Sequence, residues 1–171
     1  MDLVKLIRDV PDFPKPGILF KDITPLLGNA EALDEAVVQL ARPYEGKGIS
    51  KVAGIESRGF IFASMIARQL HAGFVPLRKK GKLPYRTLRK EYALEYGTDV
   101  IEMHEDALAK GERVLMVDDL LATGGTMAAA CDLVSGVGAT IVGAAFLVEL
   151  AFLDGRKKLP GIDIHSVIRF D

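Results

Sequence analysis

The chain has 171 residues, 49% hydrophobic and 26% charged, which is enough for one soluble domain with a substantial core. Its net charge of −1 gives no support for a nucleic-acid or membrane partner. The single cysteine, Cys131, excludes an internal disulfide framework and fits a reducing compartment, and the three histidines (His71, His104, His165) lack metal-ligand spacing. Without a signal peptide or a membrane-spanning apolar run, we expect a cytoplasmic protein that acts on a small molecule.

The N-terminal region predicts two helices separated by an extended segment. An apolar stripe over residues 3–10 indicates a short helix that ends at Pro11, because proline cannot supply the next helix N–H. Prolines recur through residues 12–27, which we therefore expect to be stiff and extended. Residues 31–44 carry apolar side chains on one face, as an amphipathic helix does.

A strand–loop–helix unit follows. Residues 51–55 predict a short buried strand, and a helix runs from the loop Glu56-Ser57-Arg58-Gly59 to about Leu70. Ligands of open α/β sheets bind at the carboxyl ends of the strands, so Arg58 is placed to meet a diphosphate bidentately. The alternative is a surface arginine near a helix start, which the helix dipole does not favour.

Residues 72–78 predict the next strand, and the most polar part of the chain, residues 79–97, comes after it. This part interleaves basic residues with aromatic ones: Lys79, Lys80, Lys82, Arg86, Arg89 and Lys90 with Tyr85, Tyr92 and Tyr96. Such a pattern occurs in nucleic-acid binding segments, in solvated loops or hairpins, and in mobile lids over polyanionic substrates. The lid agrees best with the rest of the chain. Residues 99–104 alternate like an exposed strand and are expected to pair with the end of the lid.

The most informative stretch is residues 114–126. Four apolar residues predict a buried strand, and after a short loop of small residues a helical pattern begins at Met127. Gly124 and Gly125 have no Cβ atoms, so the backbone can approach a ligand closely. Their N–H groups, together with the hydroxyls of Thr123 and Thr126, can surround a phosphate at the helix N-terminus.

Two carboxylates, Asp118 and Asp119, follow the predicted strand and precede this loop. They would repel a phosphate, so we expect them to accept hydrogen bonds from vicinal sugar hydroxyls. A sugar phosphate is the ligand that this arrangement indicates. The alternative is a strand-to-helix turn that is merely capped by Asp and Thr.

The remaining residues continue the alternation of strands and helices. Residues 140–148 form an apolar run that ends at Glu149-Leu150, residues 155–161 form a basic turn, and residues 165–170 predict a last strand. This order predicts an α/β fold with a mainly parallel central sheet flanked by helices.

The 114–126 string resembles the phosphoribosyl-diphosphate (PRPP) signature of the type I phosphoribosyltransferases: an apolar strand, two acidic residues and a Thr-Gly-Gly-Thr loop. It is neither a Walker A loop nor a dinucleotide-binding motif. Residues 12–27 resemble the amino-terminal stretch of the adenine phosphoribosyltransferases. The 56–59 loop, Leu94-Glu95-Tyr96-Gly97 and Val148-Glu149-Leu150 extend the resemblance over essentially the whole chain.

The resemblance implies one phosphoribosyltransferase domain over residues 1–171. It places a small hood, from about 1–30 and 149–171, above the sheet, and a mobile lid at about 79–97. It implies that adenine and PRPP react to give AMP and diphosphate, with Mg²⁺ bound through PRPP rather than by direct protein ligands, in a homodimer. A 6-oxopurine transferase and a non-catalytic PRPP-sensing regulator are the alternatives.

The resemblance also assigns roles to residues. Asp118 and Asp119 orient the ribose, and Glu95 approaches N7 of adenine when the lid closes. The residues implied for PRPP are Arg58, Arg78, Lys79, Lys82, Tyr96, Asp118, Asp119, Ala122, Thr123, Gly124, Gly125 and Thr126. Those implied for adenine are Leu19, Phe20, Lys21 and Leu150, with Phe20 and Leu150 covering opposite faces of the base. Lys21 departs from the arginine of some members, which matters little if the backbone makes the contact. The Glu56-Ser57 peptide bond is implied to be cis.

Overall fold

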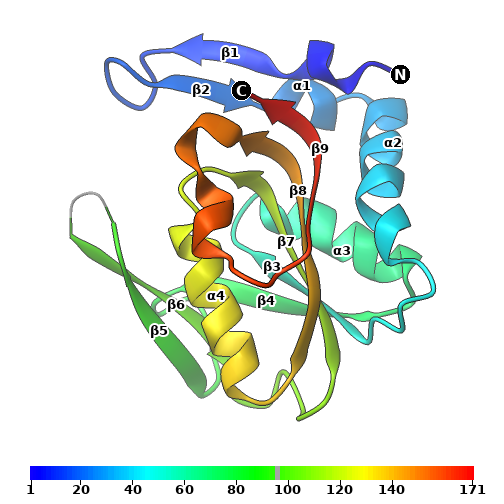
Figure 1. Cartoon of the computed structure of the whole chain (residues 1–171), viewed down its shortest axis with the longest axis vertical. Helices are drawn as coiled ribbons and strands as arrows, with labels where there is room; N and C mark the ends of the chain where they lie inside the picture. Colours follow the sequence, from blue (N-terminus) through cyan, green and yellow to red (C-terminus); the bar gives the residue numbers. More distant parts are fainter. Residues whose placement is uncertain (95–96) are drawn as a thin grey trace.

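Within residues 1–94 and 97–171, which the computed structural model describes, seven strands form one mixed sheet (Figure 1). They are β3 (Lys51–Ile55), β4 (Gly73–Lys79), β5 (Thr87–Ala93), β6 (Thr98–His104), β7 (Arg113–Leu121), β8 (Thr140–Leu150) and β9 (Ile164–Phe170). Their order across the sheet is β5-β6-β4-β3-β7-β8-β9. β4, β3, β7, β8 and β9 run parallel, and only the pairings of β6 with β4 and β5 are antiparallel. The predicted α/β fold with a mainly parallel sheet is confirmed.

Helices cover both faces of the sheet. α2 (Ala30–Ala41), continued by the 3₁₀ turn η2 (Arg42–Tyr44), and α3 (Gly59–Gln69) pack on one face, and α4 (Gly125–Gly136) packs on the other. Figure 1 shows α4 in front of the sheet and α3 behind it. Among the described residues, none of the helices combines the length and apolarity needed to cross a membrane.

Two hydrophobic cores result, and β7 contributes to both. Leu115 and Val117 belong to the core under α2 and α3, whereas Val114 and Met116 belong to the core under α4. Successive side chains of a strand point to opposite faces, so a strand covered on both sides is apolar throughout. This explains why residues 114–117 form an unbroken apolar run.

The N-terminal region differs from its prediction. The 3₁₀ helix η1 (Leu3–Leu6) is short, and the chain then forms β1 (Arg8–Pro11), which pairs antiparallel with β2 (Leu19–Asp22). The predicted helix over residues 3–10 is therefore wrong beyond Leu6. The reason is tertiary: β2 supplies backbone partners to β1, and Arg8 Nη2 lies 2.6 Å from Asp22 Oδ2.

Part of the 12–27 segment is likewise more regular than predicted. It contains β2 and the short helix α1 (Thr24–Leu27), whose first turn accommodates Pro25 because that position needs no N–H donor. Figure 1 shows the β1–β2 hairpin beside the C-terminus of the chain. Lys21 Nζ lies 4.0 Å from the ring centroid of Phe170, near the end of β9. The residues assigned to the hood thus meet at this end of the sheet, while β9 is also the edge strand of the main sheet.

The segment assigned to the lid includes the strand β5, which pairs with β6 from Thr87↔His104 to Ala93↔Thr98. The predicted pairing of residues 99–104 with the end of the lid is confirmed. The expectation that this strand is exposed is wrong at its centre, where Ile101, Glu102 and Met103 are buried. The burial arises because β6 lies between β5 and β4 and contacts α4.

Candidate active site

The candidate site lies where the parallel strands end. β3 lies between β4 and β7, so the connections from β3 and β7 diverge to helices on opposite faces, to α3 and α4 respectively. Open α/β sheets bind ligands in the crevice at such a switch point. The predicted polar loops, residues 56–58 and 122–124, both follow strands at this edge.

The loop after β7 forms a small cradle. A cavity of about 100 Å³ is lined by Asp118, Leu120, Leu121, Ala122, Thr123, Gly124, Gly125, Thr126 and Met127. It includes all five residues predicted to bind the phosphate. Gly124 has φ +83°, a conformation that side chains disfavour, and Gly125 begins α4. The cradle therefore presents backbone N–H groups and two threonines at a helix N-terminus, which favours an anion.

The two aspartates lie in β7 itself, because the strand continues to Leu121 instead of ending at Val117 as predicted. Asp119 is buried, and its Oδ2 lies 2.8 Å from Arg58 Nε as an ion pair. That oxygen has no hydrogen-bond partner among the described residues. Asp118 is half-buried, and its Oδ1 accepts a hydrogen bond from the Asp119 N–H at 2.9 Å.

The surroundings of Asp118 disfavour its charged form. Burial of the carboxyl and the neighbouring charge of Asp119 raise the pKa of Asp118 well above its ordinary value. The carboxyl also lies against the start of α3, where a Cβ on Gly59 would be 2.7 Å from Asp118 Oδ1. The pair thus offers one carboxylate held by Arg58 and one acid that protonates readily.

Cationic side chains gather at the end of β4. Arg78 Nη2 lies 3.4 Å from Glu56 Oε2, and the backbone N–H of Lys79 donates to the other carboxylate oxygen of Glu56. Lys79 Nζ pairs with Asp99 and donates to the Tyr92 hydroxyl at 2.8 Å. Burial lowers the pKa of Lys79, but the hydrogen bonds to Asp99 and Tyr92 raise it by more, so this amine stays charged.

Three further observations concern the same edge. Arg78 Nε is buried and has no hydrogen-bond partner within the described part of the chain. The side chain of Lys82 is exposed, while its carbonyl accepts from Arg78 Nη1 at 3.2 Å. The Glu56-Ser57 peptide bond is cis, which confirms the expectation from the family resemblance.

The residues predicted to bind adenine lie on the β1–β2 hairpin and at the end of β8. The Phe20 ring lies over Arg58, with 5.0 Å from the guanidinium carbon to the ring centroid, so the hairpin reaches the aspartate pair. Lys21 Nζ is 2.6 Å from Asp9 Oδ1, so the Lys21 side chain is engaged by a neighbour on the same hairpin. Leu19 is half exposed, and Leu150 is paired in register with Phe170, the residue that Lys21 covers.

Some predicted residues cannot be placed and some partners were missed. Glu95 and Tyr96 lie outside the described residues. Sequence reasoning did not single out Tyr92 and Asp99 as partners of Lys79, because the contacts depend on the β4–β6–β5 pairing. It also missed Lys158, which lines a cavity of about 470 Å³ with Thr123, Gly125 and Thr126; its only signal was the basic turn.

Comparison with known proteins identifies the family of this chain. The phosphoribosyl transferase domain family matches residues 23–167. The adenine phosphoribosyltransferase of Nitrobacter hamburgensis is 57% identical over 163 residues, which cover 95% of this chain and 91% of the relative. The chain belongs to the adenine phosphoribosyltransferases. It is therefore a pentosyl-transferring enzyme that moves the 5-phosphoribosyl group of PRPP to N9 of adenine, giving AMP and diphosphate.

Solved structures of this family share the whole fold. The crystal structure of the enzyme from Rhodothermus marinus has a TM-score of 0.95 at 57% identity and covers 98% of this chain and 96% of its own. The enzyme from Saccharomyces cerevisiae has a TM-score of 0.91 at 37% identity, with 97% and 96% covered. The similarity to these two enzymes thus extends over almost the whole chain.

Proposed function

We propose that PRPP lies along the crevice with its 5′-phosphate in the 122–126 cradle and its ribose hydroxyls on Asp118 and Asp119. The single observation that carries this proposal is the buried Asp119 carboxylate, which pairs with Arg58 at 2.8 Å and directly follows Asp118, a residue that lines the glycine-rich cradle. A carboxylate accepts hydrogen bonds from hydroxyls on its remaining lone pairs, whereas the cradle suits a dianion.

The diphosphate then leaves toward the cations at the ends of β3 and β4. We assign this role to Arg58, Arg78, Lys79 and Lys82. The buried, unpartnered Nε of Arg78 supports the assignment, since a diphosphate oxygen would satisfy it. Lys79 contributes a charge that its raised pKa preserves. These groups stabilise the negative charge that develops on the leaving group as the ribose gains oxocarbenium character.

Mg²⁺ is proposed to arrive with PRPP. Within residues 1–94 and 97–171, no group of three or more His, Cys, Asp or Glu side chains could hold a metal ion. The acids nearest the cradle, Asp118 and Asp119, suit ribose hydroxyls, so the ion would be held chiefly by PRPP oxygens. When bound, it neutralises charge on the leaving diphosphate.

Adenine is proposed to lie between Phe20 and Leu150, with its edge read by the backbone of Leu19 to Lys21. The engagement of the Lys21 side chain by Asp9 and Phe170 supports a backbone contact. By family resemblance, Glu95 is proposed to approach N7 of adenine, and Tyr96 is proposed to contact PRPP. Solved relatives are complexed with adenine and an iminoaltritol bisphosphate (the yeast enzyme) and with 9-deazaadenine (the Giardia lamblia enzyme).

The working form is proposed to be a cytoplasmic homodimer without nucleic-acid or membrane partners. The buried, unpaired Cys131, whose thiol pKa burial raises to about 12, suits a reducing compartment. Light scattering after size exclusion tests the stoichiometry, and a single species of one-chain mass would contradict it.

Asp119→Asn and Thr126→Ala test the placement of PRPP. Loss of a charge-assisted hydrogen bond costs about 1.5–3 kcal/mol, so we expect kcat/KM for PRPP to fall by about 10–150-fold in Asp119→Asn. Thr126→Ala should raise the KM for PRPP and weaken ribose 5-phosphate binding. Asp106→Asn, a change at an exposed carboxyl, is the control. Wild-type kinetics in both site variants would refute the proposed placement.

A further inference from the structure

The turn after β8 touches the phosphate cradle backbone to backbone. Gly155 begins the 3₁₀ turn η4 (Gly155–Lys158) and is buried. A Cβ on Gly155 would overlap the carbonyl oxygen of Ala122 and lie 3.0 Å from Leu121 Cδ1. A Cβ on Gly124 would in turn overlap the carbonyl oxygen of Gly155. Neither segment can move toward the other, so the position of η4 limits the shapes available to residues 122–124.

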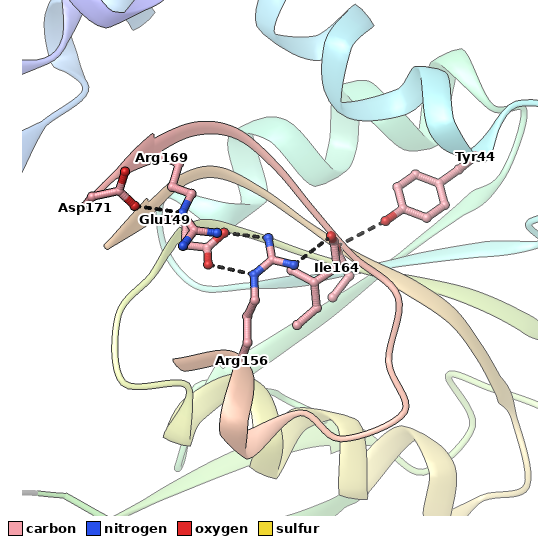
Figure 2. Close-up of polar contacts among 7 residues, drawn as sticks. Tyr44, Glu149, Arg156, Ile164, Arg169 and Asp171 are labelled. Atoms are coloured by element: carbon pink, nitrogen blue, oxygen red, sulfur yellow. Dashed lines mark hydrogen bonds and ion pairs between the residues drawn. The ribbon is translucent and has the colours of Figure 1, made fainter. Parts of the chain in front are cut away.

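An ion pair fixes this turn to the sheet. Arg156 donates from Nε and Nη2 to the two carboxylate oxygens of Glu149, both at 2.7 Å, and from Nη1 to the carbonyl of Ile164 at 3.3 Å. Figure 2 shows the guanidinium of Arg156 between the Glu149 carboxylate and the backbone of Ile164. One side chain thus ties η4 to both β8 and β9.

The carboxylate partner is buried and lies next to the cradle. Glu149 is only 3% exposed, and it is paired in register with Leu121, the last residue of β7 before the cradle. The hydrogen bonds from Arg156 lower the pKa of Glu149, so the pair stays ionised at neutral pH. A bidentate guanidinium fixes direction as well as distance, which a lysine in its place would not do.

We propose that Glu149 and Arg156 are positioning residues for the 5′-phosphate site: their ion pair holds the Gly155 backbone against residues 122–124 and so maintains the cradle in its binding shape. The proposal rests on the assignment of residues 122–126 to the 5′-phosphate. It assigns the pair no contact with either substrate. It predicts that loss of the ion pair weakens binding of the phosphorylated sugar and not of the base, because the residues proposed for adenine lie on the hairpin and at Leu150.

The test compares Arg156→Gln, Arg156→Lys and Lys157→Gln. Lys157 is the matched control, since it lies in the same turn and pairs with Asp154 at the surface. We expect Arg156→Gln to raise the KM for PRPP and the Kd for ribose 5-phosphate by about tenfold, with kcat and the KM for adenine within about twofold of wild type. Arg156→Lys keeps the charge but not the fork, so it should give an intermediate KM for PRPP.

Removal of one partner leaves a buried charge uncompensated, so Arg156→Gln can reduce folding yield. The double variant Glu149→Gln/Arg156→Gln removes both charges and should show a KM for PRPP no higher than that of the single variants, as expected for residues that act together. The proposal would be overturned in favour of a purely structural pair if the double variant melts at a lower temperature but has the same KM for PRPP as the Lys157→Gln control. Parallel changes in the KM values for both substrates would also overturn it. Thr126→Ala distinguishes failure of the phosphate assignment from failure of the positioning role. If Thr126→Ala leaves the KM for PRPP unchanged, the assignment of residues 122–126 to the 5′-phosphate fails. If Thr126→Ala raises that KM while the double variant does not, only the positioning role of Glu149 and Arg156 fails.

Discussion

Gly124→Ala is the change that the phosphate cradle should tolerate least. The residue has φ +83°, and a Cβ on it would overlap the carbonyl oxygen of Gly155 and lie 3.1 Å from the carbonyl carbon and 3.2 Å from the Cα of Gly155. All three are backbone atoms, so no side-chain rotation can relieve the overlap. The loop between β7 and α4 must shift, or η4 must move away.

The size of the effect follows from two contributions. A non-glycine residue in the left-handed region costs about 1–2 kcal/mol, and overpacking against a fixed neighbour costs a further ~1–3 kcal/mol. We therefore expect Gly124→Ala to lower the free energy of unfolding by about 2–5 kcal/mol. Because the displaced atoms form the cradle, the KM for PRPP should rise by at least about tenfold in the fraction that folds.

Urea denaturation and steady-state kinetics measure the two effects. Gly136→Ala is the matched control, since Gly136 ends α4 and a Cβ there meets nothing within 4 Å. Alanine is the better helix former, so this control should keep or slightly raise the stability, with an unchanged KM for PRPP. If Gly124→Ala unfolds and binds PRPP like the control, the close approach of Gly124 and Gly155 does not constrain the cradle.

Three further outcomes follow from the site. Asp118→Asn should lower kcat/KM by about 10–150-fold, and it should raise the melting temperature at about pH 8 but not at about pH 3. The melting temperature rises at high pH because burial and Asp119 raise the pKa of Asp118 above 3.8, so ionisation of Asp118 destabilises the folded wild type as pH rises. The same pH dependence of the melting temperature in the variant and in the wild type would refute this. Glu149→Gln should remove a stabilisation that the wild type has in full above about pH 4.5 and loses as pH falls from 4.5 through the lowered pKa of Glu149, because Arg156 favours the ionised carboxylate; acid titrations followed by circular dichroism test it. Glu95→Gln should lower kcat by about 10²–10⁴-fold with an unchanged melting temperature, against the exposed Glu91→Gln as control; equal kcat values in the two variants would remove the special role of Glu95.

The central sheet and the glycine-rich loop that forms the cradle could be predicted because their signals are local. A buried parallel strand is apolar throughout, and residues 114–117 and 140–148 are. Glycines beside threonines at a helix start indicate an anion site without knowledge of distant contacts. The position of Asp118 and Asp119 relative to the cradle was correct, although the strand continues through them to Leu121.

What sequence reasoning missed depends on contacts between distant segments. The apolar stripe at residues 3–10 has helical spacing, yet pairing with β2 makes residues 8–11 a strand. Glu102 reads as a solvated charge, but β6 buries it and the Gly81 N–H donates to it at 3.0 Å. The contact of Gly155 with Gly124 spans more than thirty residues, and no periodicity or motif signals it.

The most direct test of the account is a parallel assay of the purified enzyme with PRPP, Mg²⁺ and adenine, hypoxanthine, guanine or orotate. A site that reads the base edge through backbone hydrogen bonds rejects a base with a 6-oxo acceptor by roughly 10⁴-fold in kcat/KM. The account predicts AMP and diphosphate from adenine, with the other three bases close to background. Comparable kcat/KM values for adenine and hypoxanthine, or PRPP binding without turnover of any base, would contradict it.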